Sequence, residues 1–589
     1  MIRPTHFAAA YLALVAAGLL WIVGCERTPD RIEVADTKVE LVDGAHPRLR
    51  AHSAEFERRI YEVTEGVHVA VGYGLANSIL LVGDGGVVIV DTMESTESAS
   101  AVMADFRKIS QAPIAALIYT HNHADHVFGG RGFVPEGEVD VYAHETTSDY
   151  IDRLIGVVRP VISTRSGRMF GSVLPAEGPD AVVNAGIGPR LALGPDSGTP
   201  SLIRPNKTFR DRMQLEIAGI RIELVHAPGE TNDQLFVWLP EKRVLLPGDN
   251  IYRAFPNLYT IRGTPYRDVL DWVASLDAMR ALRPEHLVPS HTRPLSGEVE
   301  VQSVLTAYRD AIQYVHDQTV RGMNAGLTPD ELVGVVALPP HLADHPYLEE
   351  FYGTVEWSVR SVYDGYMGWF DGDAATLSPE PPDVRSRRLV ELAGGAEAMR
   401  GAARAALDAG DHAWAAELAR HAMRADPDDG EARRIVAAAY RALGRRSKSP
   451  NGRNYYLTQA GEVEGTIGAT APQINESVLP LIHEIPIDRF LAAMPSSLDP
   501  SLAGDVTMTV GFHFTDVDEH YTLALRRGVL EMQPGAPTAQ DVGIVVDSQT
   551  WREVVTGFRS PAVAFASGDV EIEGSALDLV RFLSYFSRS

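Results

Sequence analysis

The stretch Tyr119–Gly130, YTHNHADHVFGG, decides the fold of this chain, because three histidines and an aspartate follow the strand-like run AALIY. His121 and His123 are two residues apart, and such a pair would not share one face of an α-helix. On a loop leaving the strand, both can turn to one ion while Asp125 and His126 turn to another. Neutral imidazole and carboxylate are good zinc ligands. The stretch therefore predicts a metal site at a strand end.

Two adjacent divalent ions need about seven or eight such ligands. The hexapeptide from His121 to His126 supplies about half of them. The other ligands must come from other parts of the chain.

The bulk composition indicates a multidomain globular protein. With 589 residues the chain exceeds the size of one hydrophobic core, and 45% hydrophobic and 22% charged residues are ordinary for such a protein. The formal net charge of −25 would repel a phosphate backbone, so nucleic acid is not expected as a partner. A small anionic substrate would need arginines placed locally around it.

The N-terminus has the pattern of an export signal. Arg3 precedes an apolar run from Phe7 to Val23, which is shorter than the roughly 20 residues that span a bilayer. The run ends in IVGC, which resembles a bacterial lipobox, and Cys25 is the only cysteine. This resemblance implies a signal peptide over residues 1–25 and lipidation of Cys25. It further implies an exported, periplasmic protein anchored to a membrane, with the outer membrane expected; a plain signal peptide with an incidental Cys25 is the alternative.

Sequence patterning divides the rest of the chain into three parts after a polar leader at 26–54. Residues 55–298 alternate apolar, β-branched runs with helical spacing, which predicts an α/β domain with layered sheets. Residues 299–465 are helical, and DPDD at 426–429 looks like the break of a tetratricopeptide-type hairpin. Residues 471–589 predict a small α+β domain, in which 506–517 and 520–532 are each expected to form one strand.

The segment THNHADH matches the HxHxDH signature of the metallo-β-lactamase superfamily, whose fold is an αββα sandwich. The later ligands of that superfamily have counterparts in APGETND, LLPGDN and VPSHTRP, which contain Glu230, Asp249 and His291. Position by position, the resemblance implies one zinc ion on His121, His123 and Glu230, a second on Asp125, His126 and His291, and Asp249 between them. Two Zn²⁺ per chain are thus expected.

Glu230 stands where most members of the superfamily have histidine, and this resembles the alkylsulfatase branch. That branch usually has glutamate, rather than an aspartate such as Asp249, at the bridging position. Residues 338–373, 391–399 and 451–460 resemble the branch's dimerisation domain, and 568–586 resembles its sterol-carrier-like C-terminal domain. The resemblance implies a homodimer that hydrolyses small amphiphilic alkyl, or aryl, sulfate esters. Sulfate and an alcohol would be released by a hydroxide held between the metal ions, with Asp125 and Asp249 as the catalytic residues.

Recognition of the sulfate head group should involve arginine and amide donors. The segment 257–268, NLYTIRGTPYRD, matches the head-group segment of the branch, so Asn257, Tyr259 and Arg262 are the candidates. The alternative for Arg262 is a surface ion pair. Arg165 and Arg168 are weaker candidates.

Several other residues are expected to be structural. Asp91 at the end of VVIVD is predicted to form hydrogen bonds near the site, and His226 to be packed or hydrogen-bonded. Trp357 and Trp369 are predicted to pack between helices. The apolar alternation of the C-terminal domain fits an alkyl-chain site and a plain core equally well.

Two other functions remain open at this stage. One is a dizinc hydrolase of another ester, a lactone or a phosphoester. The other is a lipid-binding or scaffold protein whose metal domain is inactive.

Overall fold

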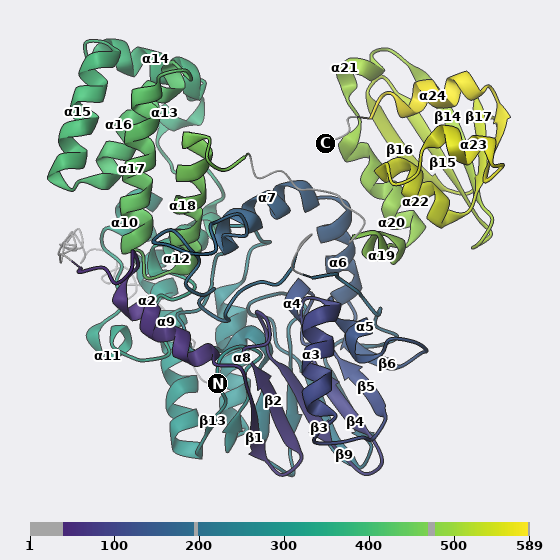
Figure 1. The fold of residues 1–589 in the computed structure, drawn as a ribbon, viewed down its shortest axis with the longest axis horizontal. Coiled ribbons are helices and arrows are strands. Elements are labelled where there is room, and N and C mark those ends of the chain that lie inside the picture. Colours follow the sequence, from purple (N-terminus) through teal and green to yellow (C-terminus); the bar gives the residue numbers. More distant parts are fainter. Residues whose placement is uncertain (1–38, 194–197, 469–477, 587–589) are drawn as a thin grey trace, which may run out of the picture.

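The computed structural model describes residues 39–193, 198–468 and 478–586, so Cys25 and the signal segment lie outside the described residues (Figure 1). In the catalytic part, two mixed sheets face each other. The first sheet runs in the order β1 (Arg59–Thr64), β2 (Val67–Val71), β3 (Ser78–Val82), β4 (Val87–Val90), β5 (Ile114–Ile118), β6 (Asp140–His144) and β7 (Lys207–Phe209). The second runs β13 (Leu295–Ser296), β12 (His286–Leu287), β11 (Val244–Leu246), β10 (Leu235–Leu239), β9 (Ile220–His226) and β8 (Arg212–Ile217).

Apolar side chains fill the space between the two sheets. Val69 and Ile118 from the first sheet belong to the same buried cluster as Leu224 and Val237 from the second. Strands covered on both faces read as continuous apolar runs, as VVIV and LFVWL do here. Seven strand-like runs of the sequence overlap β2 to β5 and β9 to β11: VHVAVG, NSILLVG, GVVIVDT, AALIYTH, IRIELVHAPG, LFVWLP and RVLLPGDN.

Helices cover the outer faces of both sheets. The helix α3 (Thr96–Phe106) packs through Val102 and Phe106 into the core on the outer side of the first sheet. The helices α8 (Val269–Ala281) and α9 (Glu298–Asn324) share the core on the outer side of the second sheet. The helix–sheet–sheet–helix layers confirm the predicted αββα sandwich (Figure 1).

Further helices of this domain precede β1 or lie between its strands. They are α2 (Pro47–His52), η1 (Ser53–Phe56), α4 (Ala124–Val127), α5 (Gly130–Phe133), α6 (Thr147–Gly156), α7 (Arg159–Phe170) and η2 (Gly248–Asn250). The helix α2 lies within the segment predicted as a polar leader, yet its Leu49 is fully buried. Part of that leader therefore packs on the domain.

The helical domain contains the predicted hairpin. Helices α16 (His412–Ala425) and α17 (Gly430–Arg446) pack together, and Asp429 of DPDD caps α17 by accepting hydrogen bonds from the N–H groups of Glu431 and Ala432. The other helices are α10 (Pro329–Val333), α11 (Pro340–Ala343), α12 (Val355–Met367), α13 (Ala374–Leu377), α14 (Pro382–Leu392), α15 (Ala396–Ala409) and α18 (Pro450–Glu464).

The C-terminal domain is an α+β unit, as predicted, but residues 520–532 do not form one strand. They divide into β15 (Glu519–Arg526) and β16 (Val529–Pro534), because Arg527 and Gly528 adopt positive φ and form a tight turn. The sheet order is β16, β15, β14 (Thr507–Phe514), β17 (Val542–Val546) and β18 (Val570–Gly574). The helices are α19 (Leu479–His483), α20 (Ile487–Ala493), η4 (Met494–Ser497), α21 (Pro500–Ala503), α22 (Ser548–Thr556), α23 (Pro561–Ala566) and α24 (Ala576–Leu583).

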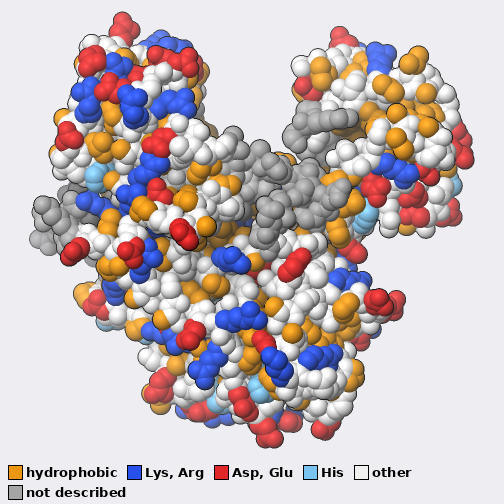
Figure 2. Space-filling model, viewed as in Figure 1, with side chains coloured by type: hydrophobic (Ala, Val, Ile, Leu, Met, Phe, Trp, Pro, Cys, Tyr) orange, Lys and Arg blue, Asp and Glu red, His pale blue; other side chains and the backbone are white. Residues whose placement is uncertain are grey.

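The C-terminal domain contacts the catalytic domain through α20 and α6, and Figure 2 shows it as a lobe of its own. Arg204 of the catalytic domain joins the two by donating to Asp152 on α6 at 2.5 Å and to the carbonyl of Glu484 at 2.5 Å. Arg489 on α20 pairs with Asp149 at 2.7 Å. Over the described residues, no helix combines the length and apolar character that crossing a bilayer requires.

Candidate metal centre

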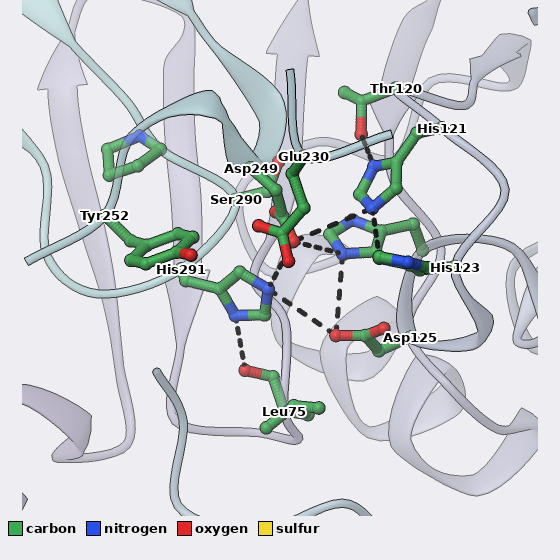
Figure 3. A network of polar contacts seen from close by, with 12 residues as sticks. Leu75, Thr120, His121, His123, Asp125, Glu230, Asp249, Tyr252, Ser290 and His291 are labelled. Atoms are coloured by element: carbon green, nitrogen blue, oxygen red, sulfur yellow. Dashed lines mark hydrogen bonds and ion pairs between the residues drawn. The ribbon is translucent and has the colours of Figure 1, made fainter. Parts of the chain in front are cut away.

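The predicted ligands lie on loops and short helices that follow strands of the two sheets, and Figure 3 shows their side chains turned toward one another. His121, His123, Asp125 and His126 follow β5, and His123 is the residue before α4. The other three come from the second sheet: Glu230 lies between β9 and β10, Asp249 in η2 after β11, and His291 after β12. The fold thus brings together residues that are up to 170 positions apart in the sequence, counting from 121 to 291.

Six of these residues form two groups with the spacing of metal ligands. His121, His123 and Asp249 form one group, and Asp125, His126 and His291 form the other, with the ligand atoms of each group within 4.8 Å of one another.

Asp249 lies between the groups, because its Oδ2 is 3.1 Å from His291 Nε2, 3.4 Å from His126 Nε2 and 3.6 Å from His121 Nε2. Asp249 is therefore close to side chains of both groups.

Glu230 is placed differently from the other six. It is also buried, and Figure 3 shows it beside Asp249, but its Oε1 is held by Arg267 Nη1 at 3.0 Å. Its Oε2 is buried and has no hydrogen-bond partner among the described residues. In the structure, Asp249 rather than Glu230 completes the group of His121 and His123.

Burial sets the protonation of these side chains. Burial holds the pKa of His121 and of His123 well below the usual value, so both imidazoles are neutral, which is the form that binds metals. Burial would raise the pKa of Asp125, but His126 and His291 overcome it and lower that pKa to about 2. Burial raises the pKa of Glu230 to about 7, although Arg267 opposes the rise.

The donor set fits divalent metal ions. His126 Nε2, Asp249 Oδ1 and Glu230 Oε2 are buried and lack a hydrogen-bond partner among the described residues. A buried polar atom without a partner costs about 1–3 kcal/mol, so three such atoms at one place indicate that something binds them. Imidazole nitrogens and carboxylate oxygens suit zinc and neighbouring transition ions.

Asp91 organises the interior side of the site. It accepts hydrogen bonds from Thr120 N at 2.8 Å, Thr120 Oγ1 at 2.9 Å and Ser290 Oγ at 2.7 Å, and its Oδ2 lies 2.8 Å from His126 Nδ1. It therefore fixes the ring of His126 with Nε2 toward Asp249, and it joins the loops that carry His121 and His291. Asp91 is thus a hydrogen-bonding residue beside the site, as predicted.

We expect Asp91→Asn to lower metal affinity about 10–100-fold, because an outer carboxylate that orients a ligating histidine contributes about that much. Competition with a chromogenic chelator measures this loss. Asp152→Asn is the control, since Asp152 on α6 is another buried carboxylate, but its partner is Arg204 rather than a residue of the metal site. Equal metal affinity in the two variants would contradict this role of Asp91.

His291 is oriented from a different loop. Its Nδ1 lies 2.9 Å from the carbonyl oxygen of Leu75, and Glu94 accepts a hydrogen bond from the N–H of Leu75 at 3.3 Å. Glu94 is fully buried, and burial, with a contribution from Asp125, raises its pKa to about 7. Sequence reasoning missed this contribution, because nothing local marks Glu94 as close to His291.

Arg267 is the other functional residue that sequence reasoning missed. It lies in the segment 257–268 together with Arg262, but it is buried, and it donates to Glu230 and to the carbonyl oxygen of Asn257. Its position within the head-group segment was the available signal. Which of the two arginines faces Glu230 depends on the tertiary structure.

The three sulfate candidates lie at different depths. Arg262 Nη2 is 3.0 Å from His123 Nε2, so this guanidinium lies against the metal site and is not a surface ion pair. Asn257 is fully buried, and both polar atoms of its amide lack a partner among the described residues. Tyr259 is partly exposed on the same loop.

The weaker arginine candidates have other contacts. Arg165 donates to the carbonyl oxygen of Ile261 at 2.6 and 3.0 Å, which supports the loop of Arg262, whereas Arg168 pairs with Glu462 on α18 at 3.1 Å.

His226 lies 2.8 Å from the carbonyl oxygen of Asn232, in agreement with its predicted structural role. The prediction for Trp369 is wrong, because its side chain follows the end of α12 and is 74% exposed.

Comparison with known proteins extends over all three domains. Residues 71–291 match the metallo-beta-lactamase superfamily, residues 328–466 match the family described as alkyl sulfatase dimerisation, and residues 477–589 match alkyl sulfatase C-terminal. The chain is 43% identical over 515 residues to a linear primary-alkylsulfatase of Pseudomonas sp., covering 85% of this chain and 97% of that protein.

More distant relatives have related names. An (R)-specific secondary-alkylsulfatase of Pseudomonas sp. is 29% identical over 96% of this chain and 85% of its own, and an alkyl/aryl-sulfatase of Saccharomyces cerevisiae is 28% identical over 90% and 82%. The solved structure of the stereoselective inverting sec-alkylsulfatase Pisa1 from Pseudomonas sp. is 28% identical. It aligns with a TM-score of 0.85 over 94% of this chain and 88% of its own.

Proposed function

Because the chain belongs to the alkylsulfatase family and is a metal-dependent sulfate ester hydrolase, we propose that it is a dizinc enzyme acting on alkyl sulfate esters. The products would be inorganic sulfate and an alcohol. The observation that carries the proposal is the carboxylate of Asp249, which lies between two groups of buried ligands beside a guanidinium.

Seven residues would hold the two ions. His121, His123 and Glu230 would bind one, Asp125, His126 and His291 the other, and Asp249 both. Glu230 would contribute through Oε2, the oxygen that Arg267 leaves without a partner. When bound, two divalent ions supply a water of lowered pKa and polarise the oxygens of the ester.

The residues around the ions would bind and orient the ester. Arg262 next to His123 would neutralise one sulfate oxygen, and Asn257, in the same segment, has a buried amide without a hydrogen-bond partner among the described residues that would offer a further donor. If the C–O bond breaks, the electron pair leaves with the sulfate and its negative charge grows; if the S–O bond breaks, the charge grows on the alcohol oxygen. Fixed donors beside either oxygen would stabilise that charge better than water does.

The direct test measures metal content and sulfate release together on protein comprising residues 26–589. Wild type should contain two zinc ions per chain and release sulfate from dodecyl sulfate, whereas His123→Ala should lose both metal and activity. Dodecyl phosphate serves as the competing substrate. If wild type contains two metal ions but hydrolyses the phosphate ester faster, the enzyme is a phosphoester hydrolase instead. If purified wild type contains no metal, the proposal is wrong.

Arg262→Ala is expected to raise KM for dodecyl sulfate and to lower kcat/KM about 10²–10³-fold, as the loss of one charge-stabilising donor does. Metal content should stay at the wild-type value, since Arg262 is not a ligand. Arg165→Ala is the matched control, because that arginine supports the same loop through the carbonyl oxygen of Ile261. A wild-type KM in Arg262→Ala would remove Arg262 from the sulfate site.

We propose that the chain forms a homodimer through its helical domain. Support comes from the match to the dimerisation family and from an exposed apolar set at the end of α12 and on α13, consisting of Tyr366, Met367, Trp369 and Leu377. Large exposed apolar groups of this kind mark protein interfaces. A mass measurement by light scattering should give two chains, and Trp369→Ser should shift the mass toward one chain.

We also propose export and lipid anchoring through Cys25, on the strength of the sequence pattern alone. Fractionation of cells should find the chain in the membrane fraction, and Cys25→Ala should release it into the soluble periplasmic fraction. The same distribution for both forms would exclude the anchor.

A further inference from the structure

The turn between β14 and β15 brings three metal-binding side chains together outside the catalytic domain. His513 on β14 and His520 on β15 are directly opposite each other across the antiparallel pair, and their rings stack with centroids 4.2 Å apart and an interplanar angle of 10°. Asp518 belongs to the turn, and its Oδ1 lies 3.3 Å from His513 Nε2. Two strands and their turn thus place three ligands on one spot.

The spacing of the ligand atoms is close to that of a coordinated ion. One atom from each of His513, Asp518 and His520 lies within 4.8 Å of the others. Zinc bonds of about 2.0–2.1 Å in tetrahedral geometry separate two ligand atoms by about 3.4 Å. The outer limit of 4.8 Å exceeds this separation by about 1.4 Å, which rotation of the exposed side chains would have to cover when an ion binds.

The backbone holds the turn in place for such an ion. Asp518 has a φ of 53°, a left-handed conformation that aspartate tolerates better than most residues. Asp516 anchors the turn to α22, since it accepts hydrogen bonds from the N–H of Ser548 at 2.8 Å and from its hydroxyl at 2.6 Å. The backbone of the turn is therefore held in place, and only the side chains need to reorient around an ion.

The side chains are accessible to a hydrated ion. The side chain of Asp518 is 91% exposed and that of His513 is 33% exposed, so the ion could keep water at a fourth position. The chain's net charge of −25 attracts cations in general. A single exposed His–Asp pair contributes only about 0–1 kcal/mol, so pairing alone is a weak reason for this arrangement.

We propose that His513, Asp518 and His520 form a further metal site, for a divalent transition ion of the zinc, nickel and copper class. Imidazole selects these ions over calcium and magnesium. An ion bound there would cross-link β14 and β15 across their turn and stabilise the C-terminal domain.

Calorimetric titration of the holoenzyme with Zn²⁺, after dialysis has removed loosely held ions, tests the site. Wild type should bind one ion per chain beyond those retained through dialysis. His520→Ala and Asp518→Asn should weaken this binding at least about 10-fold. Removing a residue that only orients a ligand lowers metal affinity by about that factor, and removing the ligand itself should lower it at least as much. Sulfate release should be unchanged in both variants, so the result is independent of the proposed function.

His286→Ala is the matched control, since His286 is a histidine of the catalytic domain that lies 2.8 Å from the hydroxyl of Ser296. This variant should bind the additional ion as wild type does. The proposal is overturned if wild type binds no additional ion, if His520→Ala binds it with wild-type affinity, or if His286→Ala loses it equally.

Discussion

Asp249→Asn is expected to slow sulfate release about 10³-fold or more and to reduce the metal content per chain. Asp249 is the one carboxylate within 3.6 Å of imidazoles from both ligand groups, and its other oxygen is buried without a partner among the described residues. An amide cannot supply the negative charge that two adjacent cations need. Losing about 4 kcal/mol of metal-dependent stabilisation of the transition state corresponds to this factor.

Metal analysis and the initial rate with dodecyl sulfate should be measured on the same preparations. Asp152→Asn, which also removes a buried carboxylate, should keep both its metal and its rate. Asp249→Glu restores the charge and should recover metal binding if the site has room for the longer side chain. Full activity in Asp249→Asn would mean that Asp249 does not bridge metals.

Arg267→Met should lower the unfolding temperature of the chelated, metal-free protein by about 10 °C. Arg267 is the cation paired with the buried carboxylate of Glu230, and removing one partner of a buried ion pair costs about 3–5 kcal/mol. At pH 8, Glu230 must then either stay charged without a partner or bind a proton that the unfolded chain has released.

The effect of Arg267→Met should depend on pH. Burial raises the pKa of Glu230 to about 7, and losing Arg267 raises it further, whereas the unfolded value is near 4.5. A raised carboxyl pKa destabilises the folded state above the unfolded value in both proteins. Because both hold Glu230 protonated below about pH 7, the difference from wild type should be small toward pH 5 and should grow as the pH rises above 7.

The double variant Arg267→Met/Glu230→Gln separates charge from packing. It removes both charged side chains, so it should recover most of the lost stability, as paired removal of buried polar groups does. Calorimetric scans of the metal-free proteins give the comparison. If the double variant unfolds as early as Arg267→Met, the loss comes from packing rather than from an uncompensated Glu230.

The layered fold could be predicted because the signals for it are local. VVIVD and LFVWLP contain apolar runs of the length of a buried strand. DPDD, between two alanine-rich runs, ends one helix and begins the next. Residues 520–532 were harder, because the turn at Arg527 and Gly528 interrupts a sequence that otherwise keeps its alternation. The packing prediction for Trp369 failed for a similar reason. An aromatic residue after an amphipathic helix has the same local sequence pattern whether its side chain is in a core or exposed.

By itself, the sequence determined the residue types and their local spacing: HNHADH places three imidazoles and a carboxylate within six residues directly after a strand. Only the tertiary structure decided which distant groups orient these side chains. Asp91 contacts His126, and the carbonyl oxygen of Leu75 contacts His291. Arg267, rather than Arg262, pairs with Glu230. The physical reason is that a ligand's identity is a local property of the chain. The charge and hydrogen bonds around it come from segments that meet only when the two sheets pack together.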